Sequence, residues 1–184
     1  MRKVVLISGK KRHGKDQFTE YVISILQEHN KIARRYAFAD ELKNICQYMF
    51  PLLTNEHLYG DKKEEPIKGY NKTTRQILQD VGVYCRDVDS NYWVSRLQNY
   101  ISESFLHEKV DYAIISDVRF PNEMEKWKYP IITVRIERPD IISNDKHISE
   151  TLLDDYGFNI YIKNDGTLED LKEKAKIFCN MCLL

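Results

Sequence analysis

The chain has 184 residues, enough for one domain with a hydrophobic core, and its formal net charge is zero. Charged residues make up 30% and hydrophobic residues 42%, which is typical of a globular protein and excludes a disordered chain. No apolar run approaches the ~20 residues of a membrane-spanning helix. The neutral balance provides no overall attraction to nucleic acid. We therefore expect neither a membrane nor a nucleic acid as a partner.

Four cysteines in a chain of this length indicate a reducing compartment rather than a disulfide framework. Cys179 and Cys182 have the spacing of a zinc-binding pair, but the sequence holds no second pair to complete the site. The basic and apolar first residues lead into a lysine-rich loop instead of the cleavage site of a signal peptide. A cytoplasmic location is expected.

Strands and helices are predicted to alternate along the chain. The predicted strands cover residues 3–8, 36–38, 112–116, 131–136 and 158–162. The predicted helices cover a segment directly after residue 15, residues 40–50, 74–84, 91–106 and 122–128, and a last helix with Thr167 as its N-cap. This alternation predicts an α/β fold with a mostly parallel five-stranded sheet flanked by helices. Such a sheet binds its ligands at the carboxyl ends of its strands.

Two polar segments interrupt the alternation. Residues 54–72 contain a run of charged side chains and are interpreted as a surface loop or a mobile flap. Residues 138–155 are interpreted as a lid that excludes water from a reaction, and a plain surface loop is the alternative. Lys146, His147 and Glu150 are the candidates for the closing contacts of such a lid.

A glycine-rich loop follows the first predicted strand directly and precedes a predicted helix. Residues 9–15 read Gly-Lys-Lys-Arg-His-Gly-Lys and match the pattern GxxxxGK. Glycines let the backbone amides point inward at phosphate oxygens, and the start of the helix adds partial positive charge. Lys15 can reach the terminal phosphates of a nucleotide. The loop therefore predicts a site for the phosphates of ATP.

Two carboxylates are predicted to hold Mg²⁺. Asp16 stands where such loops usually have Ser or Thr, and a carboxylate can bind the metal directly or through water. Asp117 follows the strand predicted at residues 112–116, which places it beside the phosphate loop. The nucleotide-binding residues expected in the loop are Gly9, Arg12, His13, Gly14, Lys15 and Asp16.

A second anion site is indicated by arginines elsewhere in the chain. Arg119 lies two residues after Asp117, on the same side of an extended chain, and a surface ion pair is the alternative. The helix at residues 74–84 places Arg75, Gln79 and Gly82 along one face, which suits a phosphate and a base but equally suits a solvated surface. Trp93 could stack on a base or belong to the core.

The whole pattern resembles one family of enzymes. Residues 6–16, Leu-Ile-Ser-Gly-Lys-Lys-Arg-His-Gly-Lys-Asp, resemble the phosphate loop of the phage deoxynucleoside monophosphate kinases, which also carry Asp after the lysine. Further matching segments are residues 39–43, 75–82, 92–94, 117–119, 122–123, 138–139, 143–150 and 164–168. Each segment is short, but together they follow the order of the family along nearly the whole chain.

The resemblance implies a P-loop kinase-type three-layer sandwich that forms a single domain over residues 1–184, with an acceptor-binding helical region at about residues 39–106. It implies ATP as donor, Mg²⁺, and a possible homodimer. The acceptor would be a deoxynucleoside monophosphate such as dTMP, dGMP or a cytosine deoxynucleotide. A phage-encoded member would act in the host cytoplasm. The catalytic residues would be Lys15, Asp117 and Arg119, and Gln17 and Arg138 would join the loop residues in holding ATP. The residues that contact the acceptor would be Lys11, Leu42, Lys43, Arg75, Gln79, Gly82, Trp93, Arg119 and Glu123.

Two alternatives remain open at this point. Animal-type phosphomevalonate kinases share the Gly-Lys-Asp loop and a strand that ends in Asp-x-Arg, but they usually have a second arginine where this chain has Phe120. A P-loop NTPase or nucleotide-binding module that is not a kinase would keep the loop and would need no second anion site.

Overall fold

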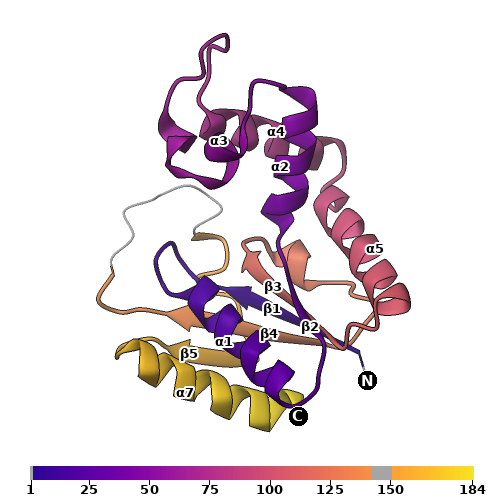
Figure 1. Ribbon diagram of the computed structural model, residues 1–184, viewed down its shortest axis with the longest axis vertical. Coiled ribbons are helices and arrows are strands. Elements are labelled where there is room, and N and C mark those ends of the chain that lie inside the picture. The colour runs from indigo at the N-terminus through magenta and orange to yellow at the C-terminus, as the bar shows by residue number, and fades with distance from the viewer. Residues whose placement is uncertain (1, 142–150) are drawn as a thin grey trace. The chain divides into compact units, whose positions relative to one another are not determined.

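The computed structural model describes residues 2–141 and 151–184. The chain divides into two compact units. Unit 1 comprises Met1–Ala37 and Gln98–Leu184 and contains the β-sheet, and unit 2 comprises Phe38–Leu97 and is helical (Figure 1). The predicted lid residues Lys146, His147 and Glu150 lie outside the described residues.

A five-stranded sheet forms the centre of unit 1. Its strands are β1 (Lys3–Ser8), β2 (Ala33–Tyr36), β3 (Tyr112–Val118), β4 (Ile131–Glu137) and β5 (Ile160–Lys163). Their order is β2-β3-β1-β4-β5, and all four pairs of neighbouring strands are parallel. The predicted fold class is confirmed. Because all strands run in the same direction, the segments after β1, β3, β4 and β5 meet at one edge of the sheet.

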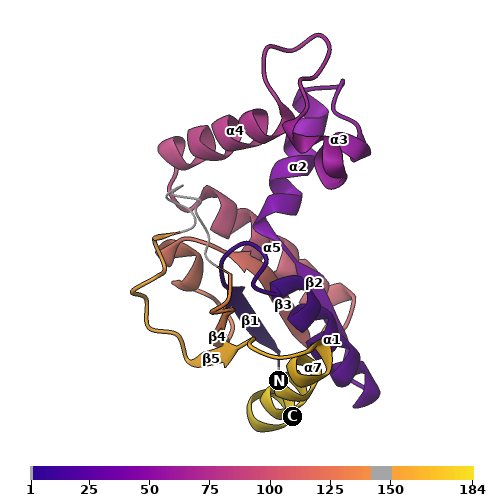
Figure 2. The ribbon, with the colours of Figure 1, turned by 90° about the vertical axis from the view of Figure 1, so that its left-hand side faces the viewer.

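Two helices of unit 1 lie side by side against the sheet, α1 (Lys15–Glu28) and α7 (Leu168–Phe178) (Figures 1 and 2). Phe18 of α1 and Phe178 of α7 are buried with ring centroids 5.8 Å apart, and they share a core with Val5 and Ile7 of β1. Thr167 accepts a hydrogen bond from the Asp170 amide, which confirms it as the N-cap of α7.

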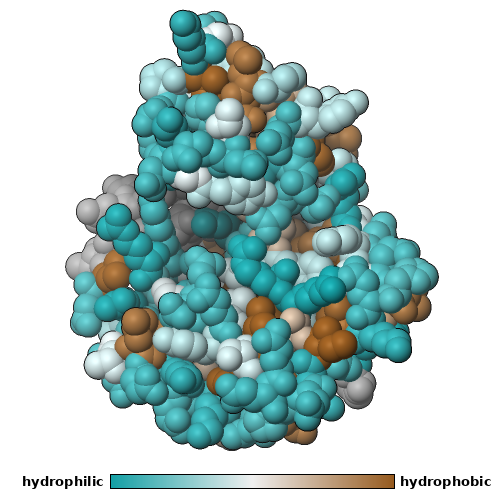
Figure 3. Space-filling model, in the orientation of Figure 1, coloured by the Kyte–Doolittle hydropathy of each residue, from teal (hydrophilic) through white to brown (hydrophobic). Residues whose placement is uncertain are grey.

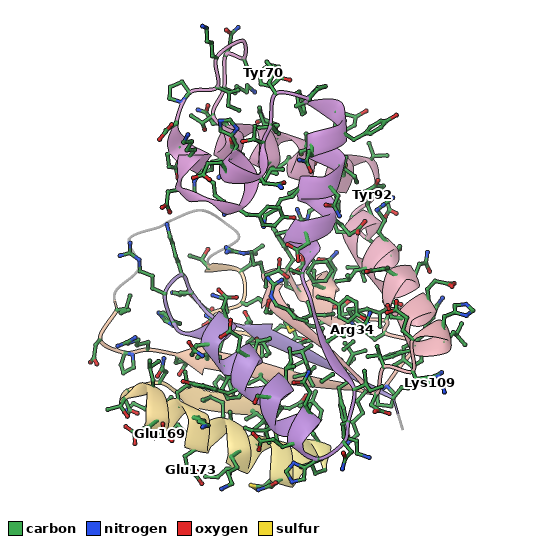
Figure 4. All side chains as sticks on the ribbon, in the orientation of Figure 1. Arg34, Tyr70, Tyr92, Lys109, Glu169 and Glu173 are labelled. Carbon is green, nitrogen blue, oxygen red and sulfur yellow. The ribbon has the colours of Figure 1, made fainter. Side chains whose placement is uncertain are left out.

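The outer surface of unit 1 is polar where the elements face solvent. Glu169 and Glu173 point outward from α7 (Figure 4). The face of this unit in Figure 3 is mainly hydrophilic, with hydrophobic residues in small separate patches. No helix in the described part of the chain is long and apolar enough to cross a membrane. All four cysteines are free, and Cys179 is fully buried in the short helical turn η3 (Cys179–Leu183).

Unit 2 has a small core of its own. Its elements are α2 (Phe38–Met49), α3 (Asn55–Tyr59), the 3₁₀ helix η1 (Asp61–Glu64), α4 (Thr74–Val88) and the first part of α5 (Tyr92–His107). The buried core residues are Cys46, Leu53, Leu58, Ile67 and Ile77. Phe50 packs edge to face on Tyr70, which is labelled in Figure 4, with ring centroids 5.7 Å apart. The helices predicted at residues 40–50 and 91–106 are present with boundaries shifted by one or two residues, and the helix predicted at residues 74–84 continues to Val88.

Two predictions about the first half of the chain are wrong. The second strand is Ala33–Tyr36 rather than residues 36–38, and α2 already begins at Phe38. Residues 54–72 are not a plain loop, because they contain α3 and η1 and bury Leu58 and Ile67. The side chains in this segment therefore support unit 2 from within.

Three further boundaries differ in the second half. β3 continues to Val118, so Asp117 lies within the strand rather than after it. The helix predicted at residues 122–128 is only the 3₁₀ helix η2 (Pro121–Met124). The last strand begins at Ile160 instead of residue 158.

Candidate functional site

The glycine-rich loop connects β1 to α1 at the carboxyl edge of the sheet. A Cβ atom at Gly9 would lie 2.5 Å from the carbonyl oxygen of Ile136, so only glycine fits beside β4. Lys15 Nζ donates to the carbonyl oxygen of Lys10 (2.8 Å), which also accepts from the amide of His13 (3.2 Å). These two bonds join both ends of the segment from Lys10 to Lys15 and close it into a turn.

The loop ends at the amino terminus of α1. Gly14 is the N-cap, with the left-handed φ of 91° that favours glycine. The first amides of a helix have no acceptor within it, and the helix dipole places partial positive charge there. A loop of this shape is suited to hold the phosphates of a nucleotide. The geometry therefore fits the ATP site predicted from the sequence.

Charged side chains gather around Lys15. Burial, and next the charge of Arg119, lower the pKa of Lys15 to about 8, while Asp16 and Asp117 act in the opposite direction. Arg135 contributes a smaller lowering. The structure thus brings the three predicted catalytic residues together with the first predicted metal ligand, and all of them belong to unit 1.

His13 holds the loop against the end of β4. Its ring is buried, and Nδ1 lies 3.3 Å from the Ile136 carbonyl oxygen and accepts from the amide of Arg138 (3.2 Å). Burial lowers the pKa of His13, which favours the neutral ring. His13 and Arg138 were both predicted to bind the nucleotide, and the structure joins them through this contact.

The other predicted loop residues are more exposed. Lys11 and Arg12 form the outer part of the loop, and Arg12 has a φ of 66°. Asp16 is exposed in the first turn of α1, and Gln17 donates to Glu20 (3.2 Å).

Glu123 positions the backbone that carries Arg119. Its carboxylate is 2% exposed and accepts from the amides of Arg119 (2.7 Å) and Phe120 (3.1 Å). Such charge-assisted bonds to backbone amides are among the stronger ones in proteins. Glu123 was predicted to contact the acceptor. In the structure its carboxylate supports the backbone at Arg119.

In unit 2, cationic candidates have partners on neighbouring elements. Lys43 Nζ lies 4.0 Å from the centre of the Tyr59 ring and 3.4 Å from Asp40. Arg75 forms an ion pair with Glu64 of η1. Both cations are partly exposed, so a phosphate could reach them and replace their present partners.

The remaining candidates of unit 2 lie on or against α4. Gly82 is buried, and a Cβ atom there would lie 3.4 Å from Leu42 of α2. The Gly82 carbonyl oxygen accepts from Trp93 Nε1 (3.2 Å) and from Arg86 (3.3 Å). Trp93 is 3% exposed, so its ring is part of the packing between α4 and α5, whereas Gln79 is exposed.

A charged network behind the loop was missed from the sequence. Arg135 is 7% exposed on β4 and donates to Ser8 Oγ (3.0 Å) and to Asp154 Oδ1 (2.8 Å). Asp154 Oδ2 accepts from Lys10 of the loop (2.8 Å). The available signal was Arg135 itself, because an arginine inside an apolar strand requires a buried partner. Asn164, also missed, donates to the carbonyl oxygen of His13 (3.0 Å).

A phosphate loop between the first strand and first helix of a parallel sheet defines the class of P-loop proteins. Comparison with known sequences and structures narrows this class. The family model for deoxynucleotide monophosphate kinase matches residues 60–175. The chain belongs to the deoxynucleotide monophosphate kinase family and is therefore a nucleotide kinase.

Two viral relatives match this chain over most of its length. A protein of Acanthamoeba polyphaga mimivirus, provisionally named deoxynucleotide monophosphate kinase, is 34% identical, with 89% of each chain covered. The deoxynucleotide monophosphate kinase of Enterobacteria phage T4 is 26% identical over 95% of this chain and 97% of its own. An unliganded sugar kinase from Janibacter sp. HTCC2649 has a TM-score of 0.50 at 13% identity, over 99% of this chain and 96% of that one, which supports the fold alone.

The alternative family is also similar to this chain. A phosphomevalonate kinase of Drosophila melanogaster is 27% identical over 92% of each chain. This identity is lower than that of the mimivirus relative, so the comparison gives the alternative no advantage.

Proposed function

We propose that this chain transfers the γ-phosphate of ATP to a deoxynucleoside monophosphate and releases ADP and a deoxynucleoside diphosphate. The observation that carries the proposal is the closed phosphate loop with Lys15, Asp117 and Arg119 in one electrostatic cluster. The names of the viral relatives support the acceptor class.

The reaction needs little covalent help from the protein. A phosphate oxygen of the acceptor is already anionic at neutral pH, so it can attack the γ-phosphorus without a general base. A bond forms between that oxygen and the γ-phosphorus, and the bond to the β–γ bridging oxygen breaks. Lys15 and the loop amides would stabilise the charge on the phosphates of ATP. Arg119 would align the acceptor phosphate through its planar pair of donors.

The donor set near Lys15 fits Mg²⁺. Asp16 and Asp117 supply hard oxygen ligands, which this ion prefers. Among the described residues, no group of three or more acidic, His or Cys side chains could hold a metal alone. This agrees with an ion that takes one or two carboxylates and completes its shell with water and substrate phosphates. When bound, Mg²⁺ would neutralise charge on the phosphate oxygens.

Unit 2 would contribute to acceptor binding. We propose that Arg75 exchanges Glu64 for the acceptor phosphate and that Lys43, Gln79 and the surroundings of Gly82 contact the nucleoside. Lys11, Leu42 and Trp93 would complete the acceptor site, either by touching the acceptor or by packing behind the residues that touch it. A homodimer remains a proposal from the family resemblance.

The direct test is a panel of acceptors. ADP formation from ATP would be measured with each of the four deoxynucleoside monophosphates, each of the four ribonucleotides and mevalonate phosphate, with and without Mg²⁺. Stimulation by at least one deoxynucleotide above the rate with water alone is the expected result. Stimulation by mevalonate phosphate alone would favour the alternative kinase, and ATP consumption that no acceptor changes would favour an NTPase.

The Lys15→Ala variant distinguishes phosphate transfer by this chain from transfer by a contaminating kinase. Loss of one positioned donor at a developing charge lowers kcat by about 10²–10³-fold. The variant should keep the far-ultraviolet circular dichroism of the parent. An unchanged rate of transfer would remove Lys15 from the mechanism.

A further inference from the structure

Asn164 comes from the far end of the sequence and reaches the phosphate loop. It follows β5 directly, is 5% exposed, and its own amide donates to the Glu137 carbonyl oxygen at the end of β4 (2.7 Å). Its side-chain Nδ2 donates to the carbonyl oxygen of His13 (3.0 Å). The residue is therefore anchored to the sheet through its backbone and to the loop through its side chain.

The bond to His13 orients a peptide group of the loop. The described peptide bonds are all trans, and in a trans peptide the C=O and N–H groups point in opposite directions. Because the His13 carbonyl points at Asn164, the amide N–H of Gly14 points away from it. That amide lies at the N-cap of α1, where an anion is favoured.

The same contact explains the glycine. A Cβ atom at Gly14 would lie only 2.5 Å from Asn164 Nδ2, so the two residues fit only as a pair. The side chain of His13 is held separately, because its Nδ1 accepts from the amide of Arg138. His13 is thus fixed at both its ring and its carbonyl, and the peptide that follows has little freedom to rotate.

We propose that Asn164 is a positioning residue of the phosphate loop, which holds the His13–Gly14 peptide so that the Gly14 amide is presented to a nucleotide phosphate. This inference rests on the proposed function, because it assumes that the loop binds a polyphosphate. Asn164 itself touches no substrate in this scheme. A residue with only a structural role in the turn would change stability and leave phosphate affinity alone.

Two variants separate these roles. Asn164→Asp keeps the shape of the side chain and replaces the donor by an oxygen that repels the His13 carbonyl, and Asn164→Ala removes the side chain. The matched control is Asp165→Asn in the same turn, whose side chain pairs with Lys163 and Lys174 instead. Dissociation constants would be measured for ADP and for inorganic tripolyphosphate by calorimetry, together with the melting temperature.

Both Asn164 variants should bind ADP and tripolyphosphate at least tenfold more weakly than the parent chain, and the control should stay within twofold. In the kinase assay, KM for ATP should rise and KM for the acceptor should stay within twofold. Affinities within twofold of the parent in a folded Asn164→Asp or Asn164→Ala chain would overturn the inference.

A measurement on the unaltered chain covers the case in which the variants fail to fold. The amide resonance of Gly14 should shift when tripolyphosphate is added, and an unshifted Gly14 resonance beside a shifted Lys15 resonance would also overturn the inference. A chain that binds ADP in an Asn164-dependent way but phosphorylates no acceptor would contradict the proposed function and support the inference. Transfer at the parent rate with unaffected ADP binding in the variants would contradict the inference alone.

Discussion

At the scale of single residues, Lys15 carries a charge that is sensitive to pH. Burial and the nearby Arg119 lower its pKa to about 8, so the free protein loses this proton within the range of ordinary assays. In the window between this value and the usual pKa of lysine, the unfolded chain holds the proton and the folded chain does not. The contribution of Lys15 to the free energy of unfolding therefore rises with pH in that window.

Nucleotide binding should reverse this loss of the proton, because the polyphosphate favours the charged amine. We predict that kcat/KM for ATP falls above about pH 8, since this ratio reports groups of the free enzyme. Calorimetry of ADP binding at pH 8.5 in two buffers of different ionisation enthalpy should reveal proton uptake. Lys15→Arg, which stays charged, should lack both effects, and a flat profile in the parent chain would contradict the prediction.

Arg119 is expected to serve the acceptor more than the donor. We predict that Arg119→Ala raises KM for the acceptor about tenfold and lowers kcat by about 10²-fold, because one side chain both binds and aligns the phosphate. The control is Arg34→Ala, which removes an exposed arginine of β2 that pairs with Glu108 (Figure 4). Steady-state kinetics with the acceptor varied would check this. An acceptor KM equal to that of the control would exclude Arg119 from the site.

The residues of the site were predictable to different degrees. Lys15, Asp16 and the glycines belong to one continuous motif, so the sequence alone was sufficient to place them together between a strand and a helix. Asp154 and Asn164 support the same loop from more than a hundred residues away. Their roles depend on the pairing of β4 with β1 and β5, which no local pattern encodes.

At the scale of elements, α4 begins with a reciprocal cap. The Thr73 hydroxyl accepts from the Gln76 amide (3.3 Å), and Gln76 Oε1 accepts from the Thr73 amide (2.9 Å). We predict that Thr73→Ala lowers the free energy of unfolding by about 1 kcal/mol, because amides at the helix start lose an acceptor. Thr73→Ser keeps the hydroxyl and should lie within about 0.5 kcal/mol of the parent chain. Denaturant unfolding would measure both, and equal midpoints for the two variants would contradict the role of the cap.

The predictions of secondary structure were wrong where exposed charges or an unusual helix cap concealed the hydrophobic pattern. β2 is an edge strand with Arg34 and Arg35 exposed, and edge strands tolerate such charge, so its apolar signal is weak. α3 begins with a cap in which His57 accepts from the Thr54 amide (3.1 Å), in place of the usual Glu or Gln. Central strands such as β1 were predictable because both of their faces are buried.

At the scale of the whole molecule, the two units differ in the size of their cores. The main cluster of unit 1 extends across the sheet, α1 and α7, whereas that of unit 2 contains five buried side chains. Local opening costs least where few apolar contacts are lost. We predict that amides of α2 and α4 exchange with solvent at lower protection than those of β1 and β3. Hydrogen exchange with mass spectrometry would test this, and equal protection in both units would contradict it.

The order of the strands has a consequence for folding during synthesis on the ribosome. β1 lies between β3 and β4, yet the ribosome makes it long before either neighbour, so Val4–Ile7 must remain unpaired until residues beyond Tyr112 have emerged. A nascent strand of this kind is prone to aggregation, which makes early shielding by a chaperone valuable. If Asn164 completes the loop as proposed, the capacity to hold a nucleotide is acquired only after residue 164 has been synthesised, about 150 residues after the loop itself.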